Sequence, residues 1–164
     1  MGFDIALFDQ SLVQKQAVNE IIKCNDFTAD YGLALTTAQV LELVETRGRA
    51  LNANGRVEFG GGVIDKVIKE FCDSPYISTY NYEQTLHELI EMFYYYKNET
   101  LDLISDDDLI KFMKTAFDGT CQGSLELLAG RELDRFARNL RGGYVCGFSE
   151  DDNYEDEGDS NGKY

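Results

Sequence analysis

The only histidine in the chain lies in a pattern that can bind a metal ion. Residues 87–91 read His-Glu-Leu-Ile-Glu, which begins like the His-Glu-x-x-His motif of zinc proteases but ends on a glutamate. With one histidine, that protease site cannot be completed in the usual way. A second arrangement stays open, in which Glu83, His87 and Glu91 share a helical face and bind a metal with a carboxylate from elsewhere. The alternative is a set of surface ion pairs worth about 0.2–0.5 kcal/mol each.

A run of three glycines before a predicted helix offers a different chemistry, the binding of an anion. Backbone N–H groups at such a turn can point at a phosphate or carboxylate, and nearby cations add positive charge. The candidate residues are Arg56, Gly60, Gly61 and Gly62, with Lys66 as a further cation. The run has neither the Gly-Lys-Ser/Thr ending of a P-loop nor the spacing of a Rossmann fingerprint. The alternative is a flexible turn that lets Phe59 and Val63 reach the core.

Three consecutive tyrosines, Tyr94, Tyr95 and Tyr96, lie within a predicted helix. Neighbouring residues of an α-helix are about 100° apart, so the three rings cannot all enter one core. At least one ring is therefore expected at the surface, where it would form an aromatic patch suited to a protein interface. The alternative is a partly buried ring with its hydroxyl group in water.

The other reactive side chains give no recognisable site. The acidic run at 106–108 lacks the alternating ligands and the glycine of an EF-hand. The four cysteines form no Cys-x-x-Cys pair, which excludes a zinc finger or ribbon. Cys24 and Cys72 are expected to be reduced, buried residues. A Cys-His nucleophile pair would need a cysteine beside His87 in the fold. We predict no catalytic residue and no cofactor.

The charge of the chain restricts its partners. Its formal net charge is −15, and acidic residues are dense from Ser149 to Tyr164. Such a surface repels phosphate backbones, so nucleic acid is not an expected partner. No apolar run approaches the roughly 20 residues that span a bilayer, and a signal peptide is not apparent. We therefore expect a cytoplasmic protein that does not enter the membrane.

The residues just discussed are positioned by a predicted central helix that starts after Asn81. Apolar and aromatic residues recur every three or four positions from Tyr82 to Tyr96, which indicates an amphipathic helix. Asn81 is the expected N-cap, with Gln84 in the capping-box position. The end of this helix is left open between Lys97 and about residue 103.

Similar patterns predict five more helices. Their approximate ranges are 11–27, 36–51, 63–72, 105–117 and 124–140, the last bent or divided at Gly130. With one proline in the chain, the fold class is predicted as all-α, a single-domain bundle of about six helices. The domain covers residues 1–146, and residues 147–164 form a disordered acidic tail.

Several stretches resemble a small family of uncharacterised bacterial proteins, mainly from Firmicutes. They are Phe8–Val13, Glu58–Gly62, Tyr82–Glu99 and Gly123–Leu133. The resemblance covers most of residues 1 to about 142 and leaves out the acidic tail. It implies a bacterial cytoplasmic protein of unknown function and supplies no catalytic residue.

Together these observations predict a non-enzymatic protein-interaction or assembly module. Its partner would be another protein or a second copy of the chain, bound at the tyrosine-bearing face of the central helix. The alternative is a small ligand-binding protein or enzyme with an anion site at Gly60–Gly62.

Overall fold

The computed structural model describes residues 2–143, with side chains from Leu12 onward. All regular structure in this range is helical, which confirms the predicted all-α class. The elements are α1 (Gly2–Ile22), α2 (Cys24–Thr28), the 3-10 turn η1 (Ala29–Tyr31), α3 (Thr37–Ala53), α4 (Gly62–Phe71), α5 (Tyr82–Glu99), α6 (Asp106–Asp118), α7 (Leu125–Leu127), the π-helical segment η2 (Leu128–Leu133) and α8 (Asp134–Arg141). The predicted tail at 147–164 lies outside the described residues, as does Cys146.

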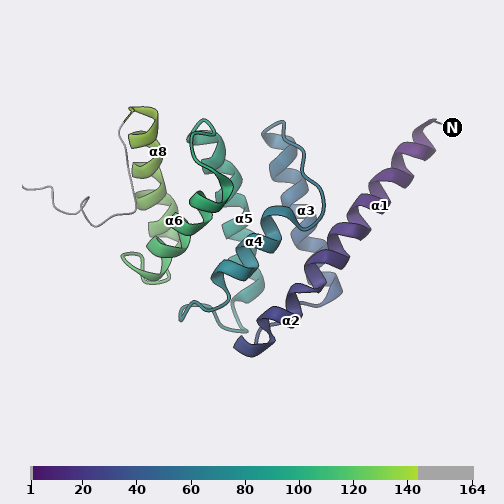
Figure 1. Cartoon of the computed structure of the whole chain (residues 1–164), viewed down its shortest axis with the longest axis horizontal. Coiled ribbons are helices and arrows are strands. Elements are labelled where there is room, and N and C mark those ends of the chain that lie inside the picture. The colour runs from purple at the N-terminus through teal and green to yellow at the C-terminus, as the bar shows by residue number, and fades with distance from the viewer. Residues whose placement is uncertain (1, 144–164) are drawn as a thin grey trace, which may run out of the picture.

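The helices are arranged in two layers. In one layer α3 lies against both α1 and α5, and in the other α4 lies against both α2 and α6. Figure 1 shows α1 at one end of the molecule and α8 at the other, with α3 to α6 between them. The interface between α3 and α5 is the most extensive in the bundle. Two helices distant in sequence therefore form one continuous surface.

The central position predicted for α5 is confirmed by its burial. Leu86, Leu89, Ile90 and Phe93 are at most 1% exposed and belong to one hydrophobic core that collects side chains from α1 through α8. The core stripe follows the three- and four-residue spacing seen in the sequence. The opposite side of α5 is left at the surface.

The capping predictions have mixed outcomes. Thr36 and Gln39 form the expected capping box at the start of α3, and Ser105 accepts from the Asp108 N–H at the start of α6. The prediction for Asn81 is wrong, because its side-chain oxygen accepts from the Ser78 N–H and makes no cap bond to α5. The local turn captures this side chain, as asparagine side chains often do.

At three helices the observed boundaries either differ from the predicted ones or settle a boundary that the sequence left open. The first helix is longer than predicted at its start and stops at Ile22, with 24–28 as a separate short helix. α5 ends at Glu99, because Leu101 and Asp102 adopt left-handed backbone angles that a helix cannot continue through. The last helix has π geometry from Leu128 to Leu133, a segment that contains Gly130, and continues as α8.

Candidate functional site

The exposed sides of α3 and α5 carry most of the chemistry that the sequence indicated. The two helices run in the same direction, because Gln39 contacts Glu83 near their starts and Ala53 lines a depression with Tyr95 near their ends. We call this surface the α3–α5 face. Its exposed or half-buried residues are Gln39, Glu42, Arg49, Glu83, His87, Glu91 and Tyr95, and the buried Thr46 contacts His87.

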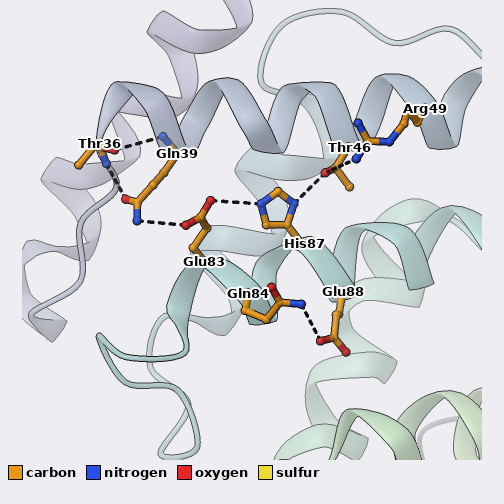
Figure 2. Close-up of polar contacts among 8 residues, drawn as sticks. All are labelled: Thr36, Gln39, Thr46, Arg49, Glu83, Gln84, His87 and Glu88. Atoms are coloured by element: carbon orange, nitrogen blue, oxygen red, sulfur yellow. Dashed lines mark hydrogen bonds and ion pairs between the residues drawn. The ribbon is translucent and has the colours of Figure 1, made fainter.

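His87 is held between the two helices by a hydrogen bond at each ring nitrogen (Figure 2). Its Nδ1 lies 2.7 Å from the Thr46 hydroxyl oxygen, and its Nε2 lies 3.3 Å from Glu83 Oε2. The Thr46 hydroxyl also accepts from Arg49 Nη2 at 3.2 Å. Because a hydroxyl group can donate or accept, Thr46 is compatible with either neutral tautomer of the ring.

Glu42 on α3 completes a cluster with Glu83 and His87. The ligand atoms of the three side chains all lie within 4.8 Å of one another. The Glu42 and Glu83 carboxyl groups share a hydrogen bond, which raises the pKa of Glu42 and lowers that of Glu83. Glu42 thus occupies the place of the carboxylate that sequence reasoning expected from elsewhere in the chain.

Glu91 does not belong to this cluster among the described residues. It lies one helical turn beyond His87 and lines a shallow depression of about 330 Å³ together with Arg49 and Tyr95. The structure therefore brings together two of the three predicted metal ligands, Glu83 and His87. The third predicted ligand, Glu91, lies beside Tyr95 instead.

The three tyrosines have different environments. Tyr95 is 56% exposed, which confirms that at least one ring reaches the surface. Tyr94 is buried and donates its hydroxyl hydrogen to Glu58, and burial raises its pKa. Tyr96 is also buried and donates to the Ala129 carbonyl at 2.7 Å. Of the three rings, only that of Tyr95 is exposed.

The glycine turn at Gly60–Gly62 is occupied by side chains of the chain itself. Glu20 accepts from the Gly61 N–H at 2.7 Å, and this hydrogen bond lowers the pKa of Glu20. Glu58 accepts from the Val63 N–H at 3.2 Å. Both carboxylates stand where an external anion would be held, so the anion hypothesis gains no support from this geometry.

The cations proposed for the anion site also have other partners. Arg56 donates to Asp102 at 2.8 Å, and Lys66 pairs with Asp107 at 2.9 Å. Phe59 is 68% exposed whereas Val63 is buried. The prediction that the turn brings both flanking residues into the core is therefore wrong for Phe59.

The cysteines of the described range are separate from His87, whose ring nitrogens contact Thr46 and Glu83. Cys24, Cys72 and Cys121 are free and buried, as expected for Cys24 and Cys72. Burial and a hydrogen bond to Asp65 raise the pKa of Cys24 to about 12. Such thiols stay protonated and are poor nucleophiles.

Comparison with known proteins adds one relationship. The model of a family of unknown function (DUF6323) matches residues 20–146. No curated protein and no solved structure matches the chain. Within the described residues, no helix has both the length and the apolar character needed to cross a membrane.

Proposed function

We propose that this chain, which belongs to the DUF6323 family of unknown function, is a non-enzymatic protein-interaction module that binds its partner at the α3–α5 face. The observation that carries the proposal is the exposure of Tyr95 beside a depression on this face. Its ring packs edge-on against buried Tyr96, with 4.8 Å between ring centroids. The exposed ring is thus held in place before any partner arrives, which lowers the entropy lost on binding.

The charge of the face favours a basic segment as the partner. Among the residues of this face, Glu42, Glu83 and Glu91 are acidic and Arg49 is basic. A partner lysine or arginine over the Tyr95 ring would gain a cation–π contact and would reach Glu91 one turn away. Self-association through this face would instead bring like charges together.

The proposed compartment is the bacterial cytoplasm. The three cysteines of the described range are free, which suits a reducing compartment. An acidic surface is compatible with this location, because it limits unwanted contacts with nucleic acid.

The proposal predicts that Tyr95→Ala weakens partner binding about tenfold, the equivalent of roughly 1.4 kcal/mol. The partner is first identified by quantitative affinity capture from the native host. Its dissociation constant for the unchanged chain and for the variant is then measured at two salt concentrations. Binding should also weaken with salt, because charge pairs contribute to it.

Tyr80→Ala is the matched control, since Tyr80 is 98% exposed in the connection before α5. This variant should bind like the unchanged protein. Equal binding by the Tyr95 and Tyr80 variants would reject the α3–α5 face as the contact surface. Light scattering on the purified chain tests the homo-oligomer alternative directly.

A further inference from the structure

The Glu42, Glu83 and His87 side chains combine two carboxylates and an imidazole on two neighbouring helices. Donor atoms around a four-coordinate ion, with ligands at about 2.0–2.2 Å, are about 3.4 Å apart. The three donors here lie within 4.8 Å of one another, and the Glu42 side chain is exposed, so its rotation can bring the carboxylate closer. A small rotamer change would therefore complete the geometry.

His87 and Glu83 are each fixed by a further hydrogen bond, as metal ligands usually are. Ligating histidines usually bind a second group through the other ring nitrogen, which fixes ring orientation. Here Thr46 is 2% exposed and lies 2.7 Å from His87 Nδ1. When Nδ1–H donates to Thr46, the Nε2 lone pair points toward the cluster. Gln39 Nε2 donates to Glu83 at 3.2 Å and is itself fixed by the α3 capping box.

The electrostatics of the cluster also favour a cation. The donor oxygens of Glu42 and Glu83 both lie within 4.8 Å of the His87 donor atom, and a cation placed among them would offset the repulsion between two carboxylates. Arg49 directs its guanidinium group to the Thr46 hydroxyl, 3.2 Å from Nη2, and away from the pairing role that a cation beside the two carboxylates would have. Glu45 adds a further negative charge near Glu42.

We infer that Glu42, Glu83 and His87 form a binding site for a divalent first-row transition-metal ion such as Zn²⁺. The imidazole ligand favours this class over Mg²⁺ and Ca²⁺, which prefer all-oxygen sites. Three protein ligands leave the remaining coordination positions to water. The site shares Glu42 and Glu83 with the α3–α5 face but does not use Tyr95, and it goes beyond the partner role of that residue.

The test is calorimetric titration of the full chain with Zn²⁺ in a Cys146→Ser background, which removes a competing thiol outside the described residues. One equivalent should bind, and Co²⁺ should give a visible absorption spectrum of a low-coordinate site. His87→Ala and Glu42→Gln should each lower Zn²⁺ affinity by at least about 100-fold. Thr46→Val should lower it by roughly 10- to 100-fold, because it removes the partner of Nδ1.

Two controls make the assignment falsifiable. Glu126→Gln changes an exposed acid in α7 and should leave Zn²⁺ affinity unchanged. Glu91→Gln should do the same, and an equal loss in this variant would overturn the choice of Glu42 as the third ligand.

Zn²⁺ affinity that is insensitive to His87→Ala, or preference for Mg²⁺ or Ca²⁺, would overturn the site. A Tyr95→Ala variant that loses its partner yet keeps Zn²⁺ binding separates the two proposals.

Discussion

Replacing Arg47 by alanine is expected to lower the free energy of unfolding by about 3–5 kcal/mol. The Arg47 side chain is 4% exposed, and its Nη1 lies 3.2 Å from Glu58 Oε1. The same nitrogen donates to the Gly60 carbonyl at 2.8 Å and the Gly61 carbonyl at 3.3 Å. The variant would leave a largely buried carboxylate without its cation and two carbonyls without this donor.

Denaturant unfolding followed by circular dichroism measures this change. Arg49→Ala, two residues along the same helix, is the matched control and should change stability by no more than about 0.5 kcal/mol, because Arg49 is exposed. A double-mutant cycle with Tyr94→Phe should show coupling, since Tyr94 donates to Glu58. If Arg47→Ala lowered the free energy of unfolding no more than Arg49→Ala, the hydrogen bonds of Arg47 to Glu58, Gly60 and Gly61 would not stabilise the fold.

The second large effect is expected at Gly123, where alanine should lower stability by about 2–4 kcal/mol. This residue has a φ of +83°, a conformation that strains residues with a Cβ atom. An added Cβ would also lie 2.6 Å from the Cβ of Tyr76. The clash involves an atom next to the Tyr76 backbone, so a side-chain rotation cannot relieve it.

Gly48 provides the opposite case within α3. It has no positive φ, and an added Cβ would meet no atom within 4 Å. Alanine at this position should therefore raise stability by about 0.5–1 kcal/mol through higher helix propensity. Thermal unfolding of both variants checks the pair. Similar shifts in the same direction would show that the local geometry at Gly123 is misassigned.

Local sequence patterns predicted the helices because the signal for each helix lies within a few turns of chain. The stripe from Tyr82 to Tyr96 and the capping box at Thr36 are examples, and both are confirmed. The Asn81 cap failed because a nearby backbone N–H competes for the same side-chain oxygen. The early start of α1 was not predicted, because the helical pattern was recognised only from residue 11 onward.

The candidate site was only partly predictable. Glu83 and His87 share a helical face, so spacing alone could pair them. Glu42 lies 41 positions before Glu83 on another helix, and no local pattern indicates that α3 packs parallel to α5. The environment of the glycine turn was missed for the same reason, since Glu20 reaches Gly61 from a distant part of the sequence.

The most direct test of the α3–α5 face is site-specific photo-crosslinking in the native host. A photoreactive phenylalanine analogue replaces Tyr95 in one variant and Tyr80 in another, and the adducts are mapped by mass spectrometry. We expect the Tyr95 position to crosslink to a lysine- or arginine-containing segment of one partner protein, while the Tyr80 position does not. A co-purifying partner that crosslinks from Tyr80 and not from Tyr95 would contradict the proposed function.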